Sequence, residues 1–249
     1  GVGIFVCSLY IAFSKYGKIK LGKNTDQPEY SSFNWGVMIF TSTMAADILF
    51  YSLCEWALYA NEKYIDQLGG IQKWASTFPL FHWGPIAWSF YIILAVAFGF
   101  MLHVRGRNKQ KFSEGCRPLL GNKVDGVVGK IIDLIAIFAL IAGTATTFSL
   151  ATPLLSAALS RVFGLPNGVG LTIAVLLLIA AVYTFTVLTG MKGISKLATY
   201  CSYLFFALLI YFLIGGGETT YILETGFSAI GNMVQNFIGL STWMDPLRE

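Results

Sequence analysis

Charged residues are scarce in this sequence. Only 12% of its 249 residues are Asp, Glu, Lys or Arg, against about 25% in an ordinary soluble domain. Hydrophobic residues make up 55% of the chain and its mean hydropathy is +0.66. Apolar runs of about 20 residues, the length that spans a bilayer, recur along it. The composition therefore excludes an ordinary soluble domain and predicts an all-α polytopic protein of the cell membrane, with the lipid bilayer as its surroundings.

Motifs for catalysis or metal binding are also missing. The chain has no HExxH pair, phosphate-binding loop, dinucleotide-binding glycine motif or serine nucleophile motif. Of its two histidines, His82 adjoins a cluster of aromatic residues but has no acidic partner in sequence, and His103 opens a basic loop and needs no catalytic role. Four cysteines lack the spacing of a metal site: Cys7, Cys54, Cys116 and Cys201. We therefore expect free thiols, no enzyme activity, and no resident metal or cofactor.

Hydrophobic segments predict a single transmembrane domain over residues 1–249. Residues 1–14 have the composition of the end of a helix, and 223–242 are amphipathic and predict a helix lying in the membrane interface. Five full spans are expected within 34–215: 34–60, 82–103, 128–152, 168–190 and 197–215. The first apolar stretch is too short to span and lacks the features of a signal peptide. We therefore expect the chain to be an internal part of a longer protein.

Basic residues mark one side of the membrane. Thirteen of the 17 Lys and Arg residues fall in or beside three alternate loops, 15–26, 104–127 and 191–196, and the opposite loops hold only four. The positive-inside rule predicts that the three basic loops are cytoplasmic. The net charge of +4 is thus a sign of topology, and no nucleic-acid partner is expected.

An odd number of spans has a consequence for the fold. Five helices that enter from the cytoplasm and end outside correspond to one repeat of the five-plus-five inverted architecture of many secondary transporters. A second repeat of opposite orientation would have to follow, and it is absent from this sequence.

The stretch 81-FHWGPIAWSFY-91 places aromatic residues around a Gly-Pro pair that interrupts a helix. On an ideal helix Trp88 and Tyr91 lie about 60° apart, and only the interruption would bring Trp83 to the same pocket. Several aromatic faces around one pocket suit a quaternary ammonium ion, which has no hydrogen to donate. The alternative is an interfacial belt of Trp and Tyr, as in any membrane protein.

The stretch 41-TSTMAADILFYSLCEW-56 carries two acids, Asp47 and Glu55, inside a span. An ionised side chain in a membrane span costs free energy, so such residues usually have a functional role. Small and hydroxyl residues before Asp47 expose the backbone and offer oxygen ligands for a hard cation such as Na⁺. The candidates for ion binding are Thr41, Ser42, Thr43, Met44, Ala45, Ala46 and Asp47, with Thr144 in 143-GTATTFSLATPLL-155. The alternatives are a packed small-residue interface for the first stretch and local helix bending for the second.

Several of these segments resemble the betaine/choline/carnitine transporter (BCCT) family. FHWGPIAWSFY is similar to the family segment FHW-x-x-x-P-W-x-x-Y. ADILFYSLCE resembles the stretch of the preceding helix that the family writes with Asp, Phe-Tyr-Gly and Glu. GKIIDLIAIFALIAGTATTFSLATPLL, VFGLP and TWMDP are similar too, and lean toward the carnitine/γ-butyrobetaine antiporter branch. The resemblance covers the whole chain and implies the inverted-repeat fold of the leucine-transporter type and a homotrimer.

The resemblance also implies roles for individual residues. It makes Trp83, Trp88 and Tyr91 the cage for a trimethylammonium group, and 41–47 an unwound helix segment. The sequence departs from the family pattern at a few positions: Thr41, Thr43 and Ala45 in place of glycines of sodium-coupled members, Ala87 in place of a proline, and Leu58 and Cys201 in place of a tyrosine and an arginine of the antiporters. The coupling ion, Na⁺ or H⁺, is left open by these departures, as is the substrate within its class.

The sequence thus predicts a secondary transporter of a betaine, choline or carnitine type compound that works by alternating access. Two other hypotheses stay open. One is a non-transporting membrane sensor or structural subunit, in which the aromatics form a belt and the acids pack. The other is an amino-acid carrier of the same fold, which would call for a polar pocket around 83–91.

Overall fold

The structure is a computed structural model that describes residues 1–23, 25–43 and 45–243. All regular structure in these residues is helical, which confirms the predicted all-α class. Among the described residues, four stretches are long and apolar enough to cross a bilayer: Ile71–Val104, Val127–Phe163, Val169–Leu188 and Met191–Gly215. The polytopic membrane class predicted from composition agrees with these helices.

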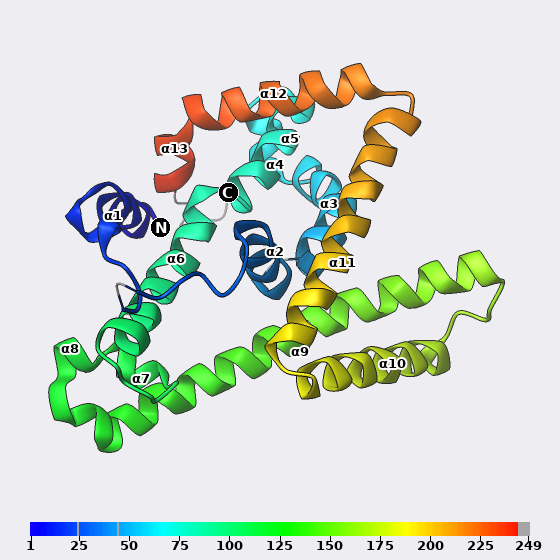
Figure 1. The fold of residues 1–249 in the computed structure, drawn as a ribbon. Helices are drawn as coiled ribbons and strands as arrows, with labels where there is room; N and C mark the ends of the chain where they lie inside the picture. The colour runs from blue at the N-terminus through cyan, green and yellow to red at the C-terminus, as the bar shows by residue number, and fades with distance from the viewer. Residues whose placement is uncertain (24, 44, 244–249) are drawn as a thin grey trace. The chain divides into compact units, whose positions relative to one another are not determined.

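The chain divides into two compact units (helices coloured by position in Figure 1). The first comprises residues 1–27, 56–142 and 226–249, and the second 28–55 and 143–225. Three helices contribute residues to both: α3 (Ala45–Ala60), α9 (Val127–Phe163) and α12 (Thr219–Gln235).

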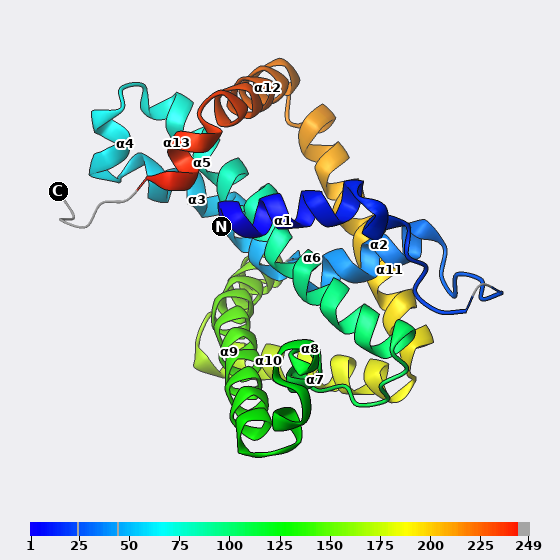
Figure 2. The same cartoon turned by 90° about the vertical axis from the view of Figure 1, so that its left-hand side faces the viewer.

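In the first unit, α1 (Val2–Phe13) packs along α6 (Pro85–Gly99) (Figures 1 and 2). The Ser8 hydroxyl lies 3.0 Å from the carbonyl oxygen of Ile4 and 3.4 Å from that of Ser89 on α6. Ser8 and Ser89 are both buried. Small side chains let two membrane helices approach closely, so this pair fixes where α1 lies against α6.

Helix α6 follows two helices that the sequence analysis did not predict, α4 (Lys63–Gln67) and α5 (Ile71–His82). The first turns of α5 are polar, and Pro79 lies inside the helix, so neither hydropathy nor propensity indicated it. The break between α5 and α6 falls at the Gly-Pro pair, as predicted. Beyond Gly99, a π-helical turn, η2 (Phe100–Val104), continues α6 and ends beside the expected limit of the 82–103 span.

The loop predicted over 104–127 contains three helical turns: α7 (Phe112–Gly115), α8 (Arg117–Leu120) and η3 (Gly121–Asp125). It is tied to α9 by Ser113, whose backbone N–H and hydroxyl each donate to a carboxylate oxygen of Asp133 at 2.9 Å. Two hydrogen bonds to one carboxylate fix the direction in which the loop meets α9.

Arg117 organises the rest of this loop. Its guanidinium donates to Glu114, with an Nε–Oε2 distance of 2.6 Å, and to both oxygens of Asp125 at 2.9 and 2.8 Å. Hydrogen bonding to Arg117 lowers the pKa of Glu114 and lowers that of Asp125 from 3.8 to about 2. The same hydrogen bonds raise the pKa of Arg117. The basic loop is therefore ordered by a forked ion pair.

In the second unit, α2 (Ser32–Thr43) packs against α11 (Met191–Ile210). Ring centroids of Phe33 and Tyr203 lie 5.6 Å apart in a stacked pair, and a tilted Phe40–Phe205 pair has the same separation. Such ring pairs add about 0.5–1.5 kcal/mol each to the area they bury. Helix α10 (Val169–Leu188) packs on α11 as well, and a π-helical turn, η4 (Tyr211–Gly215), ends α11.

Three predicted bounds are corrected by the structure. Helix α9 runs to Phe163 rather than ending at 152, with Pro153 inside it, which membrane helices tolerate. The predicted loop 191–196 is instead the start of α11, because the chain turns at Gly190, with φ of 74°, and becomes helical at once. The single helix predicted over 223–242 is two, α12 and α13 (Phe237–Thr242), separated at Asn236.

The end of α12, together with α13, is fastened to α5 within the first unit. Asn232 is buried on α12, and its amide donates to the hydroxyl of the fully buried Thr77 on α5 at 2.9 Å. Phe237 contacts Phe81 on α5, with ring centroids 6.0 Å apart, and Phe5 on α1, at 5.5 Å. This part of the amphipathic segment thus carries a specific polar contact as well as an apolar face.

Candidate functional site

Local backbone geometry at the α5–α6 break sets the position of the aromatic residues. Trp83 caps the C-terminus of α5, and its backbone N–H donates to the carbonyl oxygen of Pro79 at 3.0 Å. Gly84 is extended, and Pro85 starts α6, where its missing N–H costs nothing. A Cβ on Gly84 would lie 2.5 Å from the carbonyl oxygen of Leu80. Only glycine therefore allows the chain to leave α5 this closely.

Two of the three predicted cage residues meet directly. Trp88 and Tyr91 lie on the same side of α6, with ring centroids 6.1 Å apart and planes tilted by 53°. Trp88 is half-buried and Tyr91 is 40% exposed. The ring of Trp83, also half-buried, stacks on His82 at 4.9 Å. The structure thus brings Trp88 and Tyr91 together as predicted from their spacing, and pairs Trp83 with its neighbour in sequence.

These rings have the chemistry of a cation site. An aromatic face attracts a cation within about 6 Å of its centroid, and the tilt of Trp88 against Tyr91 leaves ring surface turned away from the contact between them. His82 was singled out from the sequence only as a neighbour of the cluster, and its stacking on Trp83 could not be inferred from helical periodicity because both lie where the helix ends.

The acid predicted as the ion-site candidate has a partner in the second unit. Asp47, half-buried on α3, accepts a hydrogen bond from the hydroxyl of Thr147 on α9 at 3.3 Å. Sequence analysis missed Thr147, although it lies in the threonine-rich stretch. Thr144, the candidate in that stretch, is exposed one turn earlier on α9. Among the described residues, no three His, Cys, Asp or Glu side chains gather as for a metal.

The backbone before Asp47 differs from the expectation where it is described. Residues 41–43 end α2 in α-helical conformation, and 45–47 begin α3, also α-helical. The Thr41 hydroxyl donates to the carbonyl oxygen of Val37 at 2.7 Å, inside its own helix. Unwinding is thus not found at these residues, since the hydroxyl returns to the helix and no glycine or proline interrupts it. Met44, and the side chains of Ser42, Thr43, Ala45 and Ala46, lie outside the described residues, and ion binding there stays a prediction.

Comparison with known proteins identifies relatives along the full length of the chain. Residues 1–249 match the family model described as "BCCT, betaine/carnitine/choline family transporter". The chain is 32% identical over 251 residues to a probable glycine betaine transporter of Desulfitobacterium hafniense, covering 98% of this chain and 49% of that protein. It is 30% identical to the glycine betaine transporter OpuD of Bacillus subtilis, covering 98% and 48%.

A carnitine transporter of Acinetobacter baumannii is 27% identical, over 96% of this chain and 44% of that protein. The chain thus spans about half the length of the curated relatives it matches. Glycine betaine and carnitine both occur among the names, so the lean toward the carnitine/γ-butyrobetaine branch stays a prediction.

Proposed function

The chain belongs to the betaine/carnitine/choline transporter family, BCCT, and on that premise we propose that the protein is a secondary transporter for a small quaternary-ammonium compound in the plasma membrane. The relatives are named as transporters rather than as enzymes, and no catalytic role is proposed. Glycine betaine, choline and carnitine are the candidate substrates.

The pairing of Trp88 and Tyr91 beside the α5–α6 break is the observation that supports this substrate class. A trimethylammonium group spreads its charge over methyl groups and cannot donate a hydrogen bond, so ring faces are its natural partners. We propose that these two rings, with Trp83, hold the cation. The exposure of Tyr91, together with the half-burial of both tryptophans, is consistent with a site that a substrate can reach.

The coupling ion and the architecture are proposed from other observations. The Asp47–Thr147 pair provides a carboxylate and a hydroxyl, which suit either Na⁺ or a proton as coupling ion. The helices from α2 to α11 are proposed to form the first repeat of the inverted-repeat fold. Transport by alternating access would follow from movement of one bundle against another around a central site. A homotrimer is proposed from the family alone.

Binding to the full-length protein tests the proposal. Tryptophan fluorescence would be titrated with glycine betaine, choline and carnitine, with and without Na⁺. We expect saturable quenching, and a loss of affinity of roughly two- to thirtyfold in Trp88→Ala, since one ring contributes ~0.5–2 kcal/mol to a cation site. Trp35→Ala is the matched control, because it removes an indole from α2 in the second unit, whereas the break lies in the first, and it should leave affinity unchanged.

Ligand controls separate the cage from a merely apolar pocket. The uncharged tert-butyl analogue of choline has the same shape without the charge and should bind more weakly than choline. Glycine should not compete with glycine betaine. If glycine or proline bound better than any quaternary amine, the protein would be an amino-acid carrier. Binding without substrate flux in proteoliposomes would instead indicate a sensor, and a folded protein that binds none of these ligands would contradict the proposal.

A further inference from the structure

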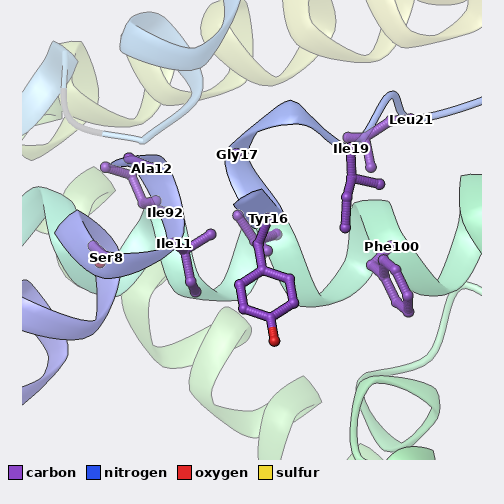
Figure 3. A pocket seen from close by; sticks show the side chains of 10 residues that line it. Ser8, Ile11, Ala12, Tyr16, Gly17, Ile19, Leu21, Ile92 and Phe100 are labelled. Carbon is purple, nitrogen blue, oxygen red and sulfur yellow. The ribbon is translucent and has the colours of Figure 1, made fainter. Parts of the chain in front are cut away.

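A polar cavity of about 200 Å³ lies between the basic loop 104–127 and the start of α9, within the first unit. Three lysines line it, Lys109 and Lys111 of the loop and Lys130 of α9, and Val124 is the only apolar residue among its described lining. Figures 1 and 2 show α7 and α8 of the loop beside this end of α9. The groove drawn in Figure 3, between α1 and α6, is lined mainly by apolar side chains and offers a charged ligand no side chain of opposite charge.

The three carboxylates that line this cavity already have hydrogen-bond donors. Both oxygens of Asp133 accept from Ser113 of α7, at 2.9 Å each. Both oxygens of Glu114 accept from the guanidinium of Arg117. Both oxygens of Asp125 accept from the same guanidinium. These carboxylates are therefore satisfied by partners other than the lysines.

The lysines, in contrast, are paired loosely or not at all. The Lys109 ammonium lies 3.5 Å from Asp125, and the Lys111 ammonium lies 3.9 Å from Asp133. Both distances exceed the roughly 2.7–2.9 Å of a strong charge-assisted hydrogen bond. Lys130 has no acidic partner among the described residues. Because exposed ion pairs at such distances add little to stability, little is lost when these ammoniums turn to another ligand.

Positive charge is in excess around the cavity. Hydrogen bonds to Arg117 lower the pKa of Glu114, and the nearby charges of Arg107 and Lys109 add to this effect. With the other two lysines, five cations thus adjoin three carboxylates among the described residues. The first turn of α9 holds no acid, so the positive end of its helix dipole adds to the excess. An excess of two positive charges matches a dianion.

We propose that this cavity binds a small divalent oxyanion of the cytoplasm, of the phosphate type, between Lys109, Lys111 and Lys130. The positive-inside rule predicts that loop 104–127 is cytoplasmic, and inorganic phosphate is abundant there. A volume of about 200 Å³ holds several water molecules, at ~30 Å³ each, but lies below the roughly 300 Å³ at which pockets for larger ligands begin.

The lining also separates a free anion from a lipid headgroup. A phospholipid needs an apolar surface beside its phosphate, and one valine does not provide it. A free oxyanion needs only the three ammoniums. Because two of these belong to the loop and one to α9, the bound anion holds the loop against the helix. The proposal is independent of the compound that the protein transports.

Calorimetric titration of the full-length protein with inorganic phosphate tests the proposal. Ionic strength is held constant with sodium chloride, so that general screening does not change. We expect saturable binding, and sulfate, which has the same shape and charge, should compete. The double variant Lys111→Gln, Lys130→Gln should bind phosphate roughly five- to thirtyfold more weakly. The control variant Lys123→Gln, Lys192→Gln removes the same charge outside the cavity and should bind as wild type does.

Hydrogen exchange followed by mass spectrometry locates the ligand. Phosphate should slow the exchange of backbone amides within 109–133 in the wild type and in the control variant. The double variant should show no such slowing at the same phosphate concentration. Exchange in α12 should be the same with and without phosphate in all three proteins, because α12 does not line the cavity.

Each outcome decides the proposal. A wild-type protein that shows no saturable binding of phosphate overturns it. Equal weakening in the double variant and its control also overturns it, since that would indicate diffuse electrostatic attraction. So does an anionic phospholipid that slows exchange within 109–133 where inorganic phosphate does not. Monodisperse elution of every variant on size exclusion establishes that the differences are not due to misfolding.

Discussion

At the scale of single residues, Gly84 is the position where the smallest change should have a large effect. A Cβ there would lie 2.5 Å from the carbonyl oxygen of Leu80 and 3.1 Å from that of Phe81. Both are backbone atoms at the end of α5 and cannot turn aside as a side chain can. We expect Gly84→Ala to lower the free energy of unfolding by about 1–3 kcal/mol and to weaken substrate binding, because Trp83 and Trp88 flank it.

The matched control for Gly84→Ala is Gly231→Ala. Gly231 lies in α12 of the same unit, and a Cβ there meets no atom within 4 Å. That change should be neutral, or stabilise the helix by up to about 1 kcal/mol. Thermal unfolding followed by tryptophan fluorescence measures both. Equal midpoints for the two variants would show that the α5–α6 break does not need glycine.

Residue patterns show how far the candidate site could be predicted. Trp88 and Tyr91 are three apart on one helix, and their contact follows from helical periodicity. Asp47 and Thr147 are 100 residues apart, so nothing local in the sequence joins them. The threonine-rich stretch was noticed, but which of its hydroxyls meets Asp47 depends on how α9 packs on α3. The stacking of Trp83 on His82 depends likewise on non-helical backbone at the break.

At the scale of elements, the contact between α12 and α5 rests on one buried polar pair. The hydroxyl of Thr77 accepts from Asn232 and donates to the carbonyl of Lys73 at 2.7 Å. Thr77→Val has nearly the same shape but leaves the Asn232 amide without that acceptor. We expect it to destabilise the protein by about 1–3 kcal/mol. Thr77→Ser keeps the oxygen and should cost only about 0.8 kcal/mol for the lost methyl group.

The unfolding midpoints of the two Thr77 variants measure this difference. A larger loss in Thr77→Ser than in Thr77→Val would mean that packing, and not the hydrogen bond, fastens α12 to α5. A further change tests the pairing itself. In an Asn232→Leu background, which lacks the amide, Thr77→Val should no longer lower the free energy of unfolding by a large amount.

The ion-paired loop should respond to acid in a defined range. The pKa of Asp125 is lowered from 3.8 to about 2 by hydrogen bonding to Arg117. A group with a lowered pKa stabilises the folded loop fully above 3.8, and this contribution is lost as the pH falls toward 2. Glu114, whose pKa is also lowered, acts in the same sense. The loop should therefore stay closed at pH 5 and open near pH 2.

Pepsin cleaves proteins in acid, and its rate of cleavage within residues 104–127 measures how often the loop opens. At pH 5, Arg117→Gln should be cut several times faster than wild type. The ratio of rates should fall toward one as the pH approaches 2, because protonation of Asp125 then weakens its ion pair with Arg117 in the wild type. Lys123→Gln removes a charge from the same loop but leaves Arg117 in place, and should follow wild type throughout. A ratio that did not change with pH would mean that the carboxylates do not hold the loop.

Helix limits show why element boundaries were harder to predict than the elements themselves. Hydropathy located α10 within two residues of its ends, because it is apolar throughout. It placed the start of α11 six residues late, because Lys192 and Lys196 suggested a loop although the helix extends past the apolar core. It missed α5, whose polar start and internal Pro79 resemble a connection. Hydropathy identifies the part of a helix that lies in the hydrocarbon core of the bilayer. The helix itself can extend beyond that part at either end.

At the scale of the whole molecule, the order of spans fixes which loops share a side of the membrane. Helix α9 has 37 residues, about 55 Å at 1.5 Å per residue, well beyond the roughly 30 Å of the hydrocarbon core. It is therefore long enough to cross once with length to spare, and α10 is long enough to cross back. Single cysteines at Lys109 and Lys192 should lie on one side, and at Asn167 on the other.

A membrane-impermeant maleimide, applied to intact cells and then to inside-out vesicles, measures this arrangement in a background without native cysteines. The cysteine at Asn167 should react in cells, and those at Lys109 and Lys192 only in vesicles, because the basic loops are predicted to be cytoplasmic. Reaction of all three from outside would contradict the positive-inside assignment. Reaction of Asn167 and Lys109 from the same side would mean that α9 does not cross the bilayer, and the proposed five-span repeat would fail with it. The expected pattern would establish two successive crossings, by α9 and then by α10, as the proposed five-span repeat requires.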